Sequence, residues 1–236
     1  MTDSFLLKTS YFALAFSFAV YYLAVCLQKR CRIAALKPLL NPLLITVVTT
    51  IAFLLATHTS YETFEAGASH LSYLLTPTTV CLAVPLYEKI GYLKKMPAAI
   101  GLGILSGVLA SALSILGMSL LFGLTGQQYA TLLPKSVTMA IGLDLSDELG
   151  GISAITAAAI TITGLFGNLA ASSIFKIFRI THPVAKGLAC GTASHAMGTA
   201  RAAELGQTEE AMSGLAIAVA GLMTVLAATL FSYIPV

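Results

Sequence analysis

The chain has 236 residues, of which 57% are hydrophobic and only 10% are charged, and its mean hydropathy is +0.89. A soluble globular domain carries roughly 25% charged residues, so this composition excludes a soluble enzyme, a DNA-binding domain and a secreted disulfide scaffold. The net charge of +3 is small and its basic residues lie in short clusters between apolar stretches, so we expect no nucleic-acid partner.

Six stretches of the sequence contain no Asp, Glu, Lys or Arg, and each is at least 20 residues long. One bilayer crossing needs about 20 mostly apolar residues. The sequence therefore predicts an all-α polytopic membrane protein with about six to eight transmembrane segments. The six stretches are 9–28, 38–61, 66–87, 96–134, 149–175 and 211–236.

The positive-inside bias places three lysine- and arginine-rich clusters, 29–37, 89–95 and 176–186, in the cytoplasm. The N-terminus is then outside, and 58–70, which contains acidic but no basic residues, is an outside loop. We expect the first helix to be retained, because a basic cluster follows it instead of a signal-peptide cleavage site. The predicted crossing helices lie near 10–28, 39–57, 71–88, 97–121 and 152–175.

Two segments are irregular. Residues 132–143 include Pro134, Lys135 and Gly142, and the chain around them has to start and end outside. Residues 187–200 are uncharged, short, and rich in Gly, Ser and Thr. Non-helical backbone at membrane depth is tolerated only where protein buries it or where it lines a wet cavity. We therefore expect broken or re-entrant helices at both places, with the acidic residues at 144–148 in a solvated loop.

A weak internal similarity occurs at an offset of 57 residues. If it is a true repeat, helices 97–121 and 152–175 are inverted relative to each other, as in transporters built from inverted repeats. Chance matching in apolar sequence is the other interpretation. The matching pairs are Pro77 and Pro134, Val80 and Val137, Ala83 and Ala140, Leu86 and Leu143, and Gly107 and Gly164.

The irregular segments carry side chains that suit a small carboxylate. Ionisable groups inside a membrane are costly and mark a functional hypothesis by default, and cations with hydroxyls offer charge and donors to carboxylate oxygens. Helical spacing places Ser194, Gly198 and Arg201 on one face, and Thr192, His195 and Thr199 on the adjoining one. The candidates in these segments are Lys135, Ser136, Thr138, Ser194, His195, Thr199 and Arg201.

Each candidate also has a structural interpretation. Lys135 would extend its ammonium to the headgroups, Arg201 would pair with Glu204, and His195 would bridge helices. The series Gly103, Gly107 and Ser111 has small-xxx-small spacing, which favours close helix packing over a binding site.

We predict no catalysis. Ser194 and His195 are adjacent, so on a helix they point about 100° apart and cannot act as nucleophile and base for each other. We predict neither a metal site nor a cofactor, because the four cysteines show no metal-binding spacing. They are Cys26, Cys31, Cys81 and Cys190.

Several stretches resemble the LrgB/CidB family. The run Gly-Thr-Ala-Ser-His-Ala-Met-Gly-Thr-Ala at 191–200 is the most specific of them. The resemblance implies a single LrgB-like transmembrane domain over 1–236, with a peripheral first helix and basic loop at 1–37 and a family core at 38–236. The other matching stretches are 41–44, 74–87, 133–138 and 149–152.

The resemblance also implies a bacterial inner-membrane protein with an LrgA/CidA-type small membrane partner. The family is described as holin/antiholin-like, modulating murein hydrolase activity and lysis, and is similar to the plastid glycolate/glycerate translocator. We predict a homo-oligomeric transporter of small monocarboxylates such as pyruvate, glycolate or glycerate, with the holin/antiholin-like function as the alternative and a purely structural scaffold as a third reading. Asn41 and Thr76, from two of the matching stretches, join the predicted pathway.

Overall fold

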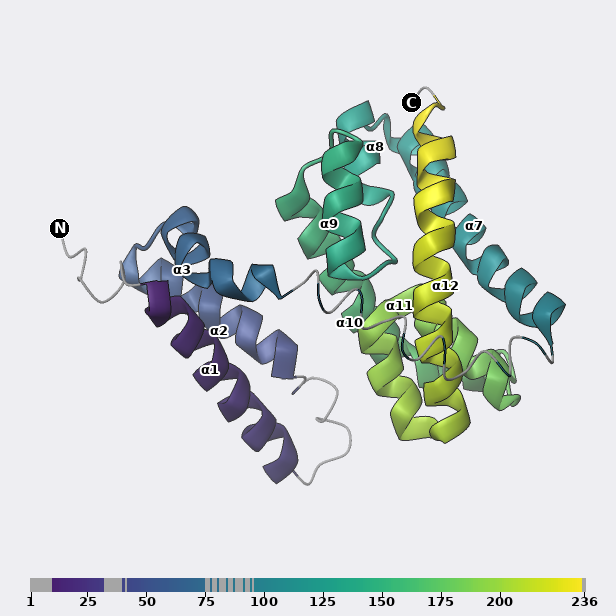
Figure 1. Cartoon of the computed structure of the whole chain (residues 1–236), viewed down its shortest axis with the longest axis horizontal. Coiled ribbons are helices and arrows are strands. Elements are labelled where there is room, and N and C mark those ends of the chain that lie inside the picture. The colour runs from purple at the N-terminus through teal and green to yellow at the C-terminus, as the bar shows by residue number, and fades with distance from the viewer. Residues whose placement is uncertain are drawn as a thin grey trace. The chain divides into compact units, whose positions relative to one another are not determined.

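The computed structural model describes residues 10–31, 40, 42–74 and 96–234, with six isolated positions between the last two ranges. Within this described part every regular element is an α-helix, which confirms the all-α class. The chain divides into two compact units, 1–78 and 79–236 (Figure 1), which are treated separately below. Asn41, Thr76 and most of the helix expected at 71–88 lie outside the described residues.

The first unit contains α1 (Ser10–Arg30), α2 (Pro42–Thr57) and α3 (Tyr61–Tyr73). Aromatic contacts join them. The ring of Phe16 lies 4.5 Å from that of Phe53 of α2, tilted to it, and 6.2 Å from that of Phe64 of α3, edge to face, between ring centroids. The expectation of an outside loop at 58–70 was wrong, because α3 occupies most of it. The Ser60 hydroxyl accepts a hydrogen bond from the Thr63 backbone N–H, a start signal for a helix.

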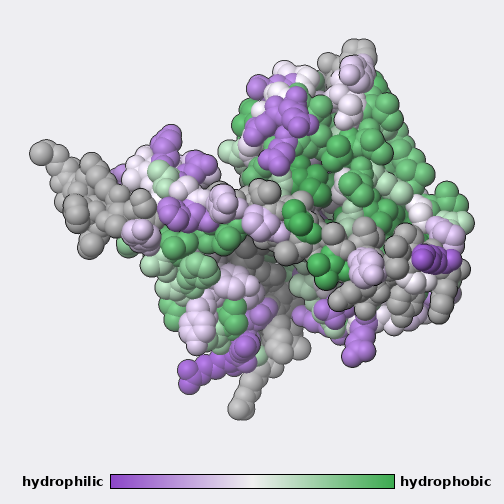
Figure 2. Space-filling model, in the orientation of Figure 1, coloured by the Kyte–Doolittle hydropathy of each residue, from purple (hydrophilic) through white to green (hydrophobic). Residues whose placement is uncertain are grey.

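The first helix of the second unit that the structure describes in full is α7 (Pro97–Phe122), which packs beside α12 (Gln207–Ser232). Four described helices, α1, α7, α10 (Ser153–Ile177) and α12, are long and apolar enough to cross a membrane. In α7 and α10 the predicted crossings at 97–121 and 152–175 are confirmed to within two residues. Figure 2 shows apolar side chains over the visible middle of the second unit and hydrophilic ones near both its upper and lower ends.

The first irregular segment forms a re-entrant hairpin, the first hairpin (126–148), made of α8 (Gly126–Leu132), a turn at 133–138, and α9 (Met139–Glu148). The Thr156 hydroxyl, near the start of α10, lies 2.7 Å from the Ser146 hydroxyl and 2.9 Å from the Thr131 carbonyl oxygen. The two arms of the hairpin therefore lie side by side against the first turn of α10. The prediction that this segment leaves and returns to the same side is confirmed.

The second irregular segment forms another hairpin, the second hairpin, which is α11 (Pro183–Leu205). Its backbone is non-helical at Ser194 and His195, and beyond this break Gly198 packs against the Cys190 carbonyl. Ala202 joins Cys190 in one buried cluster with the end of α10. The second arm therefore returns to the end of α10 from which the first arm started, and the predicted break is confirmed.

An offset of 57 residues relates the two hairpins. It carries the bounds 126 and 148 onto 183 and 205, and it carries α7 onto α10 with end differences of one and two residues. The first hairpin joins the end of α7 to the start of α10, so these helices run in opposite directions. The predicted inverted repeat is thus confirmed for the two helix–hairpin units, whereas Ala83 and Leu86 of the sequence match lie outside the described residues.

Two local expectations were wrong. The break at His195 interrupts the helical spacing that placed Ser194, Gly198 and Arg201 on one face. The acidic residues at 144–148 are exposed as expected, but they lie on α9 instead of a loop, because the returning arm of the hairpin needs hydrogen-bonded backbone at membrane depth.

We expect Gly191→Ala to destabilise the second unit by about 1–3 kcal/mol through overpacking. A Cβ at Gly191 would meet the backbone carbonyl of Ser213 and lie 2.9 Å from the Cβ of Ala216 in α12. Thermal unfolding of the detergent-purified protein measures the effect as a lower Tm. The matched control is Gly117→Ala, where no atom lies within 4 Å of the new Cβ and helix propensity favours Ala by up to about 1 kcal/mol. Equal Tm values for the two variants would contradict this packing.

Candidate ligand-binding cavity

An open cavity of about 860 Å³ lies in the second unit, between α7, α10 and the two hairpins. This volume falls in the range of small-molecule sites. Most of its wall is apolar, and its polar lining comes from lysine, serine and threonine side chains: Ser106, Ser111, Ser114, Lys135, Ser136, Thr163, Thr192 and Ser194. None of the lining residues described is acidic, so the polar groups of this described lining are one ammonium and several hydroxyls.

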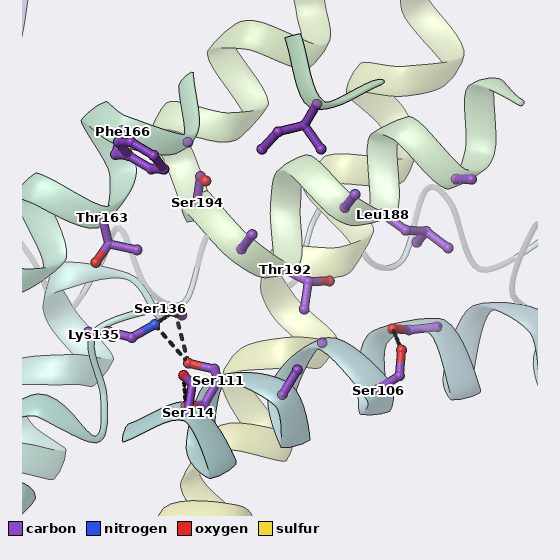
Figure 3. A pocket seen from close by; sticks show the side chains of 18 of the residues that line it. Ser106, Ser111, Ser114, Lys135, Ser136, Thr163, Phe166, Leu188, Thr192 and Ser194 are labelled. Atoms are coloured by element: carbon purple, nitrogen blue, oxygen red, sulfur yellow. Dashed lines mark hydrogen bonds between the residues drawn. The ribbon is translucent and has the colours of Figure 1, made fainter. Parts of the chain in front are cut away.

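The ammonium of Lys135 is held by two hydroxyls at one end of the cavity (Figure 3). It donates to the Ser111 oxygen at 3.1 Å and to the Ser136 oxygen at 3.0 Å, and Ser111 donates to Ser136 at 3.1 Å. An ammonium has three donors, so this triangle leaves one of them for a further acceptor.

Lys135 lies far from both ends of the candidate spanning helix α7. Ser111, to which it is bonded, lies near the middle of the spanning helix α7. The structural interpretation of the sequence expected this side chain to extend to the headgroups. It does not, because its ammonium is bonded in the middle of α7. Among the described residues the ion pair is the one between Arg201 and Glu204. Lys135 therefore has no carboxylate partner among these residues. A cation at this depth is costly unless an anion or cavity water accompanies it.

Two glycines of α10 shape the tip of the second hairpin. A Cβ at Gly167 would occupy the space of the Ser194 hydroxyl, and one at Gly164 would lie 2.7 Å from the His195 ring. His195 has φ 42° and ψ −133°, and its Nε2 lies 3.1 Å from the Ile160 carbonyl. These contacts direct the imidazole toward α10, and Ser194 lines the cavity.

The structure brings three of the predicted residues together at the cavity: Lys135, Ser136 and Ser194. Thr138 precedes α9 in the same turn, and its buried hydroxyl has no partner in the described part of the chain. His195 bridges α11 and α10, as its structural interpretation proposed.

The other two described candidates, Thr199 and Arg201, hold the second arm of the hairpin. The Thr199 hydroxyl lies 2.7 Å from that of Ser213 in α12. Arg201 donates to the Ser172 hydroxyl at 2.6 Å and pairs with Glu204. Of the two predicted cations, Lys135 therefore lines the cavity and Arg201 does not, because the chain reverses between Ser194 and Arg201.

Sequence reasoning missed several lining residues. Gly103, Gly107 and Ser111 were read as a packing seam, but all three line the cavity, and Gly107 alone also packs tightly, against Thr192. Thr192, expected on the face beside Ser194, also lines the cavity, and at the offset of 57 it is the counterpart of Lys135. Ser106 and Ser114 donate to carbonyls of their own helix at 2.8 and 2.7 Å, so they add little free polarity.

The sequence pattern of the LrgB-like family matches residues 17–234. The chain belongs to the LrgB-like family. It is similar to proteins named antiholin-like protein LrgB from Bacillus cereus and Bacillus anthracis, each 34% identical over 223 residues, which is 94% of this chain and 96% of the relative. No solved structure matches it.

The region shared with the LrgB-like family contains both hairpins and every residue that lines the cavity. The repeat and the cavity therefore belong to the part of the chain that the relatives share. With four spanning helices in the described part, this LrgB-like chain is a membrane protein.

We expect His195→Gly to be more stable than His195→Ala by about 1–3 kcal/mol, because a side chain at this backbone conformation is strained. Both variants lose the contact with Ile160, so their difference isolates the backbone. In a regular helix the order is reversed by about 1 kcal/mol, and the same pair of substitutions at Thr199 provides that control. Chemical or thermal unfolding in detergent measures both pairs. If the alanine variant were the more stable one at both His195 and Thr199, the backbone at His195 would not be strained.

Proposed function

We propose that this chain acts as an antiholin-like membrane protein of the bacterial inner membrane, modulating murein hydrolase activity and lysis. The observation that supports this is the 34% identity to antiholin-like LrgB proteins across 94% of the chain. An LrgA/CidA-type membrane protein would be its partner, and a homo-oligomer its working state. No covalent chemistry is involved.

Expression of the chain in a bacterium that lacks its own LrgB-type gene tests this function. We expect slower lysis after cell-wall damage and less extracellular murein hydrolase activity, measured by turbidity and by zymography. Gly191→Leu, which separates α11 from α12, should abolish the effect, and Gly117→Leu, whose site is open, should keep it. Identical lysis with and without the wild-type chain would exclude the function.

A second function is favoured by the position of Lys135. We also propose that the cavity carries small monocarboxylates of the pyruvate, glycolate or glycerate type across the membrane. Transporters built from inverted repeats have their substrate sites near the membrane midplane, between discontinuous helices. Lys135, which has no carboxylate partner in the described part of the chain, lies in the turn of one of two hairpins that start from opposite ends of the unit. The ammonium supplies the charge and the free donor that a carboxylate requires.

A nonselective pore would use the same helices differently. It would need its polar residues along a continuous water-filled path, whereas here α7 turns serine hydroxyls back onto its own carbonyls. The face with Gly103 and Gly107 is turned toward α11 instead of toward another copy of the chain. These contacts support a selective cavity within one chain.

Uptake of labelled pyruvate into proteoliposomes tests the second function. We expect saturable uptake by the wild type and a loss of at least about tenfold in Lys135→Ala, because the substrate loses a charge-assisted hydrogen bond. Lys176→Ala removes the same charge from an exposed position outside the cavity and should transport normally. Equal uptake by both folded variants, or leakage of an uncharged dye at the same rate as pyruvate, would exclude carriage through this cavity.

A further inference from the structure

The cavity occupies one half of the second unit. Its described lining includes Ala99 and Ala185, each the third residue of its helix. Of the described lining residues, none belongs to α7 beyond Ser114, to α8 or α9, or to α10 before Ile162. The cavity therefore extends from Lys135 toward the end of the unit where α7 starts, and the arms of the first hairpin lie at the opposite end (Figure 1).

Buried hydroxyls hold the first hairpin at that opposite end. Thr156, near the start of α10, donates to the Thr131 carbonyl of one arm at 2.9 Å, and its oxygen lies 2.7 Å from the Ser146 hydroxyl of the other arm. Each of these three residues is at most 1% exposed. One side chain of α10 therefore ties both arms of the hairpin to the start of this helix.

The equivalent positions at the open end are not packed in this way. The offset of 57 residues carries Thr156 to Ala99 and Ile160 to Gly103. Thr156 and Ile160 are at most 1% exposed, whereas Ala99 and Gly103 are exposed and line the cavity. Inverted repeats of this kind alternate between two arrangements, in which the open and the closed end exchange. The buried positions at the start of α10 therefore mark the end that is closed in this structure.

Hydroxyls suit a contact that has to open. When the cluster opens, water can replace the hydrogen bonds that its members lose, and the Thr156 hydroxyl also has the Ile152 carbonyl of its own helix at 3.2 Å. Hydrogen bonds between helices in membranes are individually weak. Breaking them therefore leaves a second arrangement within reach of a small population shift.

We propose that Thr156 is a gating residue, which keeps the first hairpin closed against α10 and whose release opens the cavity at the end where α10 starts. The role rests on the carboxylate carriage proposed above. The positive-inside bias puts the start of α10 outside, so this structure is the state open to the cytoplasm. A carboxylate at Lys135 then reaches the outer face when the bonds of Thr156 to the two arms break.

Labelling of the cavity from each face of the membrane tests the gate. Ala110→Cys places a thiol in the lining, and a membrane-impermeant maleimide is added to right-side-out or inside-out vesicles that contain the full-length protein. Mass spectrometry reads the label at position 110. We expect labelling at least about tenfold faster from the cytoplasmic face, because the other arrangement is a minor state. Adding Thr156→Val, which keeps the shape of the side chain, should raise labelling from the outer face about tenfold, the value of two interhelical hydrogen bonds.

Two further variants separate gating from folding. Thr156→Ser keeps the hydroxyl and should label as the wild-type gate does. Thr161→Val makes the same change as Thr156→Val in the same helix, but its hydroxyl bonds to the Ala157 carbonyl of α10 itself at 2.8 Å, so labelling should be unchanged.

The gate and the carriage fail in different ways. Equal labelling of the Ala110→Cys protein from both faces, or an outer rate that Thr156→Val leaves unchanged, would overturn the gate. Saturable pyruvate uptake by the wild type would in that case leave carriage standing. The absence of saturable uptake would overturn carriage, and with it the role of Thr156 in transport.

Discussion

The second unit depends on satisfying two stretches of non-helical backbone at membrane depth, where lipid offers no hydrogen bonds. Ile160 of α10 serves both hairpins: its side chain fills the space left by Gly142, and its carbonyl lies next to the His195 ring. Gly164 and Gly167 let the second tip approach α10. Missing Cβ atoms at these positions are what allow helix breaks inside the membrane to be closed by protein.

The repeat is symmetric in backbone and asymmetric in chemistry. Both hairpins have the same length and offset, yet Lys135 has Thr192 as its counterpart, and Ser111 has Asn168, which donates to the Met197 carbonyl. The first hairpin therefore supplies charge to the cavity, whereas the second hairpin carries no charge at the equivalent position and is supported by an amide donor from α10. An inverted pair with a lysine in each half would place two uncompensated cations at the membrane centre, which is far more costly.

The sequence predicted what the bilayer imposes directly. Charge-free length located α7 and α10 to within two residues, and topology counting required the return at 124–151. It failed where a distant helix decides the local structure. Nothing in the run 191–200 marks Ser194 and His195 as the break, because the glycines that accommodate it lie in α10. Because helical spacing was extended through that break, Arg201 was predicted on the wrong face. The Ser60 cap at the start of α3 was a local signal that a reading based on hydropathy did not use.

The antiholin-like function and the carriage of carboxylates are compatible, because they concern objects of different size. A cavity of about 860 Å³ suits a small molecule, and a folded murein hydrolase cannot pass through it. Any influence of this chain on hydrolases is therefore exerted without their passage through the cavity. If the cavity carries monocarboxylates as proposed, an acid bound at Lys135 would neutralise the cation of the first hairpin. The proposed carriage and the proposed effect on lysis would then share the charge state of this one side chain.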